Sequence, residues 1–295
     1  MREGIEMAKS ILIIGATGNV GLPLTKMLSE HGYDVKAAVR SSTNVEVLRA
    51  LGVETIQADL RNFFSLMNAM NLVEKVFFAV PFVSSFVQLS MNVVKAAEEA
   101  GVEHLVKLSG SGAQYEAIQL AKWHRIIERE MMKSGLHYTF LRPNSFMQNF
   151  TNFSSGTIDD HGSFYLPLGE GRVSFIDARD IASVAYHVLT EKGHDGQAYE
   201  LTGPEAISCA HVASSLSNVL GKEIRYNGIT EEEARQMMLE EGLHAGIVEA
   251  RLELYQLNRL GYSSAITNTV RDITGKSPYT FEQFAWDYRE RFRGK

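Results

Sequence analysis

The sequence predicts an α/β fold in which a doubly wound parallel sheet is followed by a smaller, mainly helical C-terminal lobe. Short apolar runs typical of strands alternate with helical patterns through the first half of the 295 residues, as in a parallel sheet with helices on both faces. The first run, residues 10–14, leads directly into three glycines spaced three apart and then into a helical segment. After Pro143 this alternation stops, and most of the remaining pattern is helical.

The first strand and the glycines after it form the strongest functional motif. Glycines allow a tight turn and a close approach of the backbone to a pyrophosphate, and the helix that follows offers free N–H groups to an anion. Strand, glycines and helix in this order predict a dinucleotide site in a Rossmann-like domain rather than a structural turn. The loop residues expected to contact the cofactor are Gly15, Thr17, Gly18, Asn19, Val20 and Gly21.

The other elements of the first half follow from their apolar patterns. Strands are expected at 33–39, 53–57, 75–80, 104–108 and 137–141. Helices are expected between them at 22–30, 45–51, 63–70, 86–100 and 114–133. The last of these helices is closed by Ser134 and Gly135, a typical C-terminal stop.

The second half is less regular. Residues 144–160 are polar and expected to be irregular, whereas 163–166 should form an isolated strand. A helix is expected from Asp177 to Thr190 and a last strand at 198–202, before tail helices at 210–220, 231–240, 244–260 and 281–291. We therefore expect residues 9–150, rejoined by 173–202, to form the NADP-binding domain, and residues 151–172 and 203–295 to form a lobe that covers the substrate.

Composition excludes several classes of protein. The net charge is −6 and no run of Lys or Arg occurs, so electrostatics do not favour nucleic acid. Cys209 is the only cysteine, which rules out an intrachain disulfide and fits a reducing cytosol. No apolar segment reaches membrane-spanning length, and residues 1–9 are expected to be a frayed tail. We expect a cytoplasmic monomer or homodimer without nucleic-acid or membrane partners. No metal is expected, because the spacing of His161, His194, His211 and His244 is not that of metal ligands.

Four segments resemble the NmrA-like family of atypical short-chain dehydrogenase/reductases. They are the glycine loop 15–21, the Arg-Pro…Phe-Met-x-Asn segment within 141–149, the Asp-x-Arg-Asp-Ile-Ala helix start within 175–182, and the terminal Gly-x-x-Pro…Phe-x-x-Phe pattern within 274–284. They occur in family order and cover most of the chain. The resemblance implies NADPH-dependent reduction of quinones, azo dyes or triphenylmethane dyes. It also allows a nucleotide-binding regulator without turnover.

Arg40 indicates which cofactor is preferred. An NAD-selective site places a carboxylate after the second strand to hold the ribose 2′-hydroxyl. Here that strand ends at Arg40, followed by Ser41 and Ser42. A guanidinium pairs well with a 2′-phosphate, so we expect NADPH in preference to NADH. The alternative is a solvated loop arginine.

Other cofactor contacts are implied by the resemblance. Asp59 and Leu60 should line the adenine, although Asp59 could instead cap the helix that begins at Phe63. Ala79, Val80 and Pro81 should lie beside the cofactor ribose, although Pro81 could equally be a loop breaker.

Further candidates follow the later strands of the sheet. Ser109 lies after the fifth strand, at the edge where open sheets bind ligands, and its alternative is a flexible loop. Asn144 and Phe146 should flank the nicotinamide, although Phe146 could belong to the core. Asp177, Arg179 and Asp180 are expected to form a buried structural network, and Cys209 to be inert.

The catalytic candidates are His124 and Glu128. No tyrosine is followed by a lysine four residues later, which argues against ordinary alcohol–ketone interconversion. Related pinoresinol and isoflavone reductases carry a lysine fourteen residues before a Tyr-Thr pair, here Tyr138-Thr139, and that position holds His124. NmrA-like proteins commonly have His-x-x-x-Glu there.

Their spacing allows two interpretations. Residues four apart on a helix can touch, so Glu128 could orient an imidazole that donates a proton near the nicotinamide. The alternative is a structural surface pair at the edge of an apolar stripe formed by Leu120, Trp123, Ile127 and Met131. The sequence thus predicts an NADPH-dependent reductase of conjugated aromatic acceptors, or else an NADP-binding sensor that acts through a protein partner.

Overall fold

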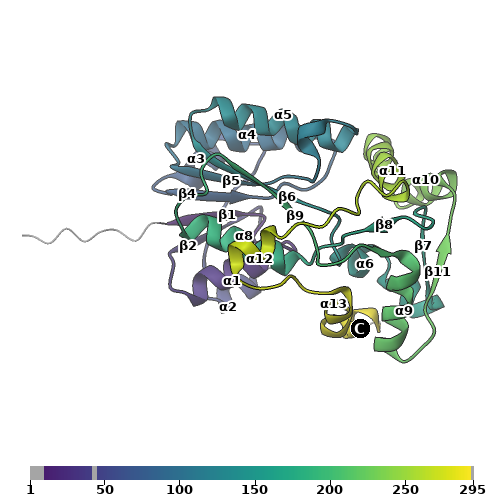
Figure 1. Ribbon diagram of the computed structural model, residues 1–295. Helices are drawn as coiled ribbons and strands as arrows, with labels where there is room; N and C mark the ends of the chain where they lie inside the picture. Colours follow the sequence, from purple (N-terminus) through teal and green to yellow (C-terminus); the bar gives the residue numbers. More distant parts are fainter. Residues whose placement is uncertain (1–9, 42–44, 294–295) are drawn as a thin grey trace, which may run out of the picture.

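A seven-stranded parallel sheet forms the centre of the computed structural model, which describes residues 10–41 and 45–293 (Figure 1). The strand order is β3-β2-β1-β4-β5-β6-β9, and all neighbouring pairs are parallel. The doubly wound sheet is therefore confirmed. The predicted tail at 1–9 and Ser42 lie outside the described residues. The strands are β1 (Ile11–Ile14), β2 (Val35–Val39), β3 (Glu54–Gln57), β4 (Lys75–Phe78), β5 (His104–Leu108), β6 (His137–Pro143) and β9 (Gln197–Leu201).

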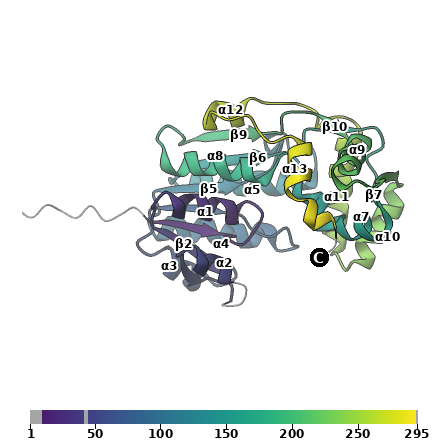
Figure 2. The ribbon, with the colours of Figure 1, turned by 90° about the horizontal axis from the view of Figure 1, so that it is seen from below.

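Helices cover both faces of this sheet because successive strand residues point to opposite sides. Ile11 and Ile13 face one apolar cluster, and Leu12 and Ile14 face another. The first cluster is closed by α1 (Gly21–Glu30), α2 (Glu46–Ala50), α8 (Ala178–Thr190) and α12 (Thr269–Thr274). The second is closed by α3 (Phe63–Met70), α4 (Phe86–Glu99) and α5 (Gln119–Lys133). Figure 2 shows α1 and α8 side by side across their face.

The strand order reverses direction between β1 and β4. From β1 the chain adds β2 and β3 on one side of the sheet, and from β4 it adds β5 and β6 on the other side. In open α/β sheets such a switch point creates a crevice at the carboxyl ends of the strands, where ligands bind. The glycine loop follows β1 at this position. The fold therefore places the predicted dinucleotide motif where a ligand crevice is expected.

A second lobe lies beyond the carboxyl ends of the strands (Figure 1). Phe150 is at the centre of its core and packs edge-to-face against Phe164, Phe175 and Phe281. The helices of the lobe are α6 (Gln148–Phe153), α7 (Ser155–His161), α9 (Cys209–Leu220), α10 (Glu231–Glu240), α11 (Ala245–Arg259), α13 (Phe281–Asp287) and a 3₁₀ turn, Arg289–Phe292. Two small sheets accompany them: β7 (Ser163–Leu166) pairs in parallel with β11 (Arg225–Gly228), and β8 (Arg172–Val173) pairs antiparallel with β10 (Ile207–Ser208).

Some predicted boundaries are wrong for identifiable reasons. The predicted helix from residue 114 begins only at Gln119, because Gly112 and Glu116 adopt left-handed conformations around a short 3₁₀ turn, Ala113–Tyr115. The predicted irregular segment 144–160 contains α6 and α7, which bury Phe150 and Ile158. Their one or two turns are too short to show a helical period. Among the described residues, none of the helices combines the length and apolar character that crossing a bilayer requires.

Candidate functional site

The glycine loop is held against the neighbouring strand by close backbone contacts. Gly15 has φ = 87°, and a Cβ there would lie 2.7 Å from the Ala79 carbonyl oxygen. A Cβ on Gly21 would lie only 2.0 Å from the Gly15 carbonyl oxygen. Both positions therefore require glycine for packing, whereas a Cβ on Gly18 would meet only the Gly15 oxygen at 3.2 Å.

The start of α1 remains available to an anion. No side chain caps this helix and its first turn holds no acidic residue, so its positive dipole end is not neutralised locally. Thr17, Gly18 and Asn19 are exposed on the loop in front of it. The Val20 side chain is buried in the core, so at this position only the backbone can face a cofactor.

Arg40 lies exposed just after β2. It forms no hydrogen bond or ion pair with any residue that the structure describes, and Asp59 is the carboxylate near enough to feel its charge. Hydrogen bonds from Arg61 hold the pKa of Asp59 below its ordinary value, with a smaller contribution from Arg40. An arginine without a local partner at this position fits a 2′-phosphate.

Asp59 does not cap α3, so the alternative prediction that it is a helix cap is wrong. Its carboxylate instead accepts hydrogen bonds from the Arg61 backbone N–H, Nε and Nη2 at 3.0, 3.1 and 2.9 Å. The cap of α3 is Asn62, whose side chain accepts from the Ser65 N–H at 3.1 Å. Leu60 beside it packs partly into the core under α3 and α4.

The other predicted cofactor residues share one edge of the sheet. Ala79, Val80 and Pro81 follow β4, Ser109 follows β5, and Asn144 and Phe146 follow β6. Asn144 is buried, and its Nδ2 donates to Ser174 Oγ at 2.8 Å and to the Ser263 carbonyl at 2.9 Å. It therefore ties the end of β6 to the second lobe, while Phe146 packs partly into the core below.

Lys107 is a buried lysine at this edge of the sheet, and it is not among the site residues predicted from the sequence. It lies on β5, an interior strand of the sheet, and is only 1% exposed. Its Nζ lies 2.8 Å from His124 Nδ1 and donates to the Leu108 carbonyl at 3.2 Å. A lysine among the apolar residues Leu105, Val106 and Leu108 of a predicted strand is a signal that could have found it, because lysine is almost never fully buried without a partner.

Burial changes the acid–base behaviour of this pair. It lowers the pKa of Lys107 to about 7, an effect that the nearby Glu128 opposes. Burial and, second, the charge of Lys107 hold the pKa of His124 well below its ordinary value. Loss of solvation disfavours the charged form of either base. At neutral pH the imidazole is therefore neutral, and Lys107 is close to its titration point.

Glu128 does not hold the His124 ring, which corrects the predicted contact. Its carboxylate accepts a bidentate pair from Arg142 at 2.9 and 2.8 Å, Ser109 Oγ at 2.7 Å and Arg125 Nη1 at 3.1 Å. Burial opposes ionisation of Glu128, but these hydrogen bonds outweigh it and keep its pKa below the ordinary value. A bidentate guanidinium is a stronger partner for a carboxylate than a neutral imidazole.

The helix that carries both candidates is also oriented differently from the prediction. The residues that α5 buries are Ala121, His124, Ile127, Glu128 and Met131, whereas Leu120 and Trp123 are only half-buried. His124 and Glu128 therefore face the sheet. The predicted alternative, a surface pair, is wrong.

The expected structural network at α8 is present. Asp177 caps the helix, and Arg179 bridges Asp177 at 2.7 Å and Asp287 at 2.6 Å. Asp180 accepts from the Tyr279 N–H at 2.9 Å. Cys209 is buried, which raises the pKa of its thiol to about 12. Within 10–41 and 45–293, no group of three or more His, Cys, Asp or Glu side chains is arranged to hold a metal ion.

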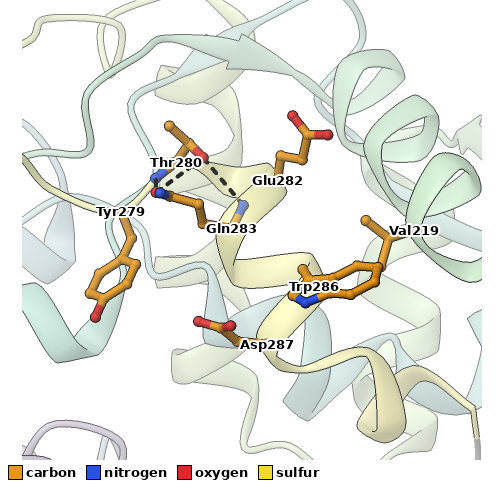
Figure 3. A pocket seen from close by; sticks show the side chains of 7 residues that line it. All are labelled: Val219, Tyr279, Thr280, Glu282, Gln283, Trp286 and Asp287. Atoms are coloured by element: carbon orange, nitrogen blue, oxygen red, sulfur yellow. Dashed lines mark hydrogen bonds between the residues drawn. The ribbon is translucent and has the colours of Figure 1, made fainter.

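Two surface hollows lie away from this edge. The larger, about 570 Å³, is lined by Tyr279 and Thr280, by Trp286 and other residues of α13, and by Val219 of α9 (Figure 3). Its polar residues Thr280 and Gln283 already bond to each other as the capping box of α13. The second, about 400 Å³, lies between α1, α8 and residues 274–279. Neither hollow includes the glycine loop or His124, so neither identifies the reactive site.

Comparison with known families agrees with the motifs. A model of the NmrA-like family matches residues 7–284. This chain belongs to the NmrA-like family.

Individual relatives carry more specific names. The chain is 41% identical over 276 residues to an NAD(P)H azoreductase of Xenophilus azovorans. This alignment covers 93% of this chain and 96% of the relative. The chain is similar to a Citrobacter triphenylmethane reductase solved with NADP(H), at 26% identity, 94% and 99% coverage and a TM-score of 0.82. It also resembles an NADPH-complexed quinone oxidoreductase of Escherichia coli, at 26% identity, 95% and 99% coverage and a TM-score of 0.84.

Proposed function

We propose that this protein is an NADPH-dependent reductase that transfers hydride to a conjugated aromatic acceptor of the quinone, azo or triarylmethane type. Membership of the NmrA-like family and 41% identity to an NAD(P)H azoreductase support the reductase class. The observation that carries the proposal in this chain is the position of His124. This histidine packs at the carboxyl edge of the sheet, the same edge that presents the glycine loop.

The residues around the glycine loop fit NADPH. The uncapped start of α1 suits a pyrophosphate, and the lack of a side chain on the exposed Gly18 allows its close approach. Arg40 would pair with the 2′-phosphate. Residues 79–81, Ser109, Asn144 and Phe146 would extend the binding surface toward the nicotinamide. When bound there, NADPH supplies the hydride, and the protein's own part is to bind, orient and protonate.

The proton requirement depends on the acceptor. A neutral azo or quinone acceptor that receives hydride must also receive a proton, whereas a cationic triarylmethane dye becomes neutral by accepting hydride alone. His124 is the side chain that would donate this proton, because its Nε2 makes no hydrogen bond to any described residue. A positioned proton donor of this kind typically contributes about 10²–10⁴-fold in rate.

The second lobe would cover the acceptor. Besides the contacts of Asn144, it reaches the sheet domain where Glu253 of α11 accepts from the Gln119 N–H at the start of α5, at 2.5 Å. This contact lies five residues before His124 on the same helix. A lobe anchored on both sides of the crevice would exclude water from the reacting groups.

A panel of neutral azo dyes, quinones and cationic triarylmethane dyes tests the proposal, with oxidation of NADPH followed by absorbance. We expect turnover with at least one class. Tight binding of NADPH without consumption in the presence of any acceptor would contradict an enzyme and favour the sensor.

A further inference from the structure

We propose that Lys107 is a positioning residue that fixes the tautomer of His124 and supplies the proton which His124 passes to the acceptor. This inference rests on the proposed function, in which His124 is the donor. It assigns a role to a buried lysine that no sequence motif singled out.

The contact geometry determines which imidazole nitrogen carries the proton. Lys107 Nζ can only donate when it is an ammonium group, so Nδ1 of His124, 2.8 Å away, must accept. A neutral imidazole that accepts at Nδ1 carries its hydrogen on Nε2. Phe86 holds the ring edge-to-face, with the centroids 5.1 Å apart. The lysine therefore leaves an N–H donor on the side of the ring opposite to itself.

Gly110 defines the surroundings of that donor. A Cβ at this position would lie 2.9 Å from His124 Cδ2 and 3.1 Å from Nε2. Only a residue without a side chain leaves the backbone in place and the ring unshifted. Since Gly110 lies two residues after the carboxyl end of β5, the Nε2 side of His124 faces the loop at the edge where open sheets bind ligands.

The surroundings of Lys107 favour a proton donor over a structural cation. His124 and Glu128 face it from α5 and Arg142 faces it from β6, while the Phe86 ring of α4 lies 5.9 Å away. Glu128 is already occupied by Arg142, Arg125 and Ser109, so Lys107 lacks the direct carboxylate partner that usually keeps a buried lysine charged. With a pKa near 7, its ammonium form gives up a proton readily at neutral pH.

The relay balances in protons. As hydride adds to a neutral acceptor, the Nε2–H bond of His124 breaks and its proton bonds to the atom that gains negative charge. Nδ1 takes a proton from Lys107 Nζ, which leaves a neutral amine and an imidazole protonated on Nδ1. After the product leaves, Nε2 takes a proton from water and Nδ1 returns its proton to the amine. The net change is one hydride and one proton added to the acceptor.

The difference between acceptors provides a test that a structural role would not pass. We compare Lys107→Met with wild type on a neutral azo dye and on a cationic triarylmethane dye, each with saturating NADPH. The variant should lose about 10²-fold in kcat on the azo dye and stay within about threefold on the cationic dye. Lys75→Met is the matched control, because Lys75 is a half-buried lysine of the adjacent strand β4 that donates to the Leu189 carbonyl.

Lys107→Arg separates charge from proton release. Arginine keeps a donor and a positive charge, but it does not deprotonate in a protein. We therefore expect no rescue of azo reduction. Wild-type kcat on the azo dye should fall as pH rises above about 7, and this dependence should be absent from both variants.

The tautomer can be measured without turnover. In protein with nitrogen-labelled histidine, NMR shifts should show the Nε2–H form at His124 in wild type and loss of this preference in Lys107→Met. His124→Gln identifies the signal.

The outcomes separate the relay from the proposed function. Equal losses on both dyes, or an unchanged tautomer in Lys107→Met, would overturn the relay while the reductase activity stands. A wild-type protein that binds NADPH but oxidises it with none of the azo, quinone and triarylmethane acceptors would overturn the proposed function and, with it, the relay. If wild type reduces a quinone but not the azo dye, the quinone serves as the neutral acceptor in the same comparison.

Discussion

At the residue scale, the site depends on a few charged side chains whose partners decide what they can do. Arg40 lies exposed beside the end of β2 without a hydrogen-bonded partner among the described residues. The guanidinium of Arg142 instead donates two hydrogen bonds to the buried Glu128 carboxylate. The first arginine is therefore available to a ligand and the second is structural, although the sequence shows both at the end of a strand.

Arg40→Ala should narrow the preference for NADPH over NADH. Loss of a charge-assisted contact to phosphate costs about 1.5–3 kcal/mol, or about ten- to hundredfold in affinity. Affinity for NADH should change little, because its ribose lacks the phosphate. Binding titrations with both cofactors measure the gap, and Arg225→Ala, an exposed arginine of the second lobe, is the control. Equal weakening of both cofactors would show that Arg40 is structural.

Asp180 should make stability depend on pH. Burial raises its pKa to about 7, an effect only partly offset by the Tyr279 N–H. Because the native state keeps this proton to higher pH than the unfolded chain does, unfolding free energy should fall between about pH 4 and pH 7, by about 1–3 kcal/mol. Asp180→Asn, which keeps an acceptor for Tyr279, should flatten this part of the curve. Denaturant titrations at several pH values measure it, and an unchanged slope in the variant would contradict the assignment.

At the element scale, the glycines divide into two kinds. A Cβ on Gly18 would meet only the Gly15 carbonyl oxygen, at 3.2 Å, whereas a Cβ on Gly21 would lie 2.0 Å from that oxygen. Gly18→Asp should abolish NADPH binding and leave the melting temperature near wild type, because it adds bulk and negative charge where the pyrophosphate approaches. Gly21→Ala should lower the melting temperature. Gly156→Asp, at a site with no atom within 4 Å of a Cβ, is the control. Undiminished affinity in Gly18→Asp would exclude the loop as the cofactor site.

Some strands could be predicted from the sequence, whereas others, and the ion pairs between elements, could not. Strands β1 and β5 were predictable because a buried parallel strand is a short, mostly apolar run. Strand β11 was not, since its Arg-Tyr-Asn-Gly sequence has no such pattern and is ordered by pairing with β7. The ion pair of Glu128 with Arg142 could not be predicted either. The two residues lie on different elements, α5 and β6, and the local i,i+4 spacing suggested His124 as the partner of Glu128 instead.

At the scale of the whole molecule, the expected ligand crevice lies where the sheet domain, with its two apolar clusters, meets the separately packed second lobe. The sheet has an apolar cluster on each face, and the second lobe has a cluster around Phe150. Polar contacts such as Asn144 with Ser263 and Glu253 with Gln119 join them. We infer that this arrangement presents the cofactor on one side and leaves acceptor choice to the lobe. The lobe contacts could not be predicted from sequence, because their partners are more than a hundred residues apart.

The role of His124 as proton donor is tested by the turnover of a neutral azo dye by wild type and by His124→Gln, with NADPH affinity and melting temperature measured in parallel. Glutamine keeps an acceptor for Lys107 but is not an acid. We expect turnover by wild type and a loss of about 10²–10⁴-fold in kcat in the variant, with NADPH affinity and stability near wild type. A wild type that binds NADPH but never oxidises it would exclude the reductase, and a variant within about threefold of wild type in kcat would exclude His124 as the proton donor.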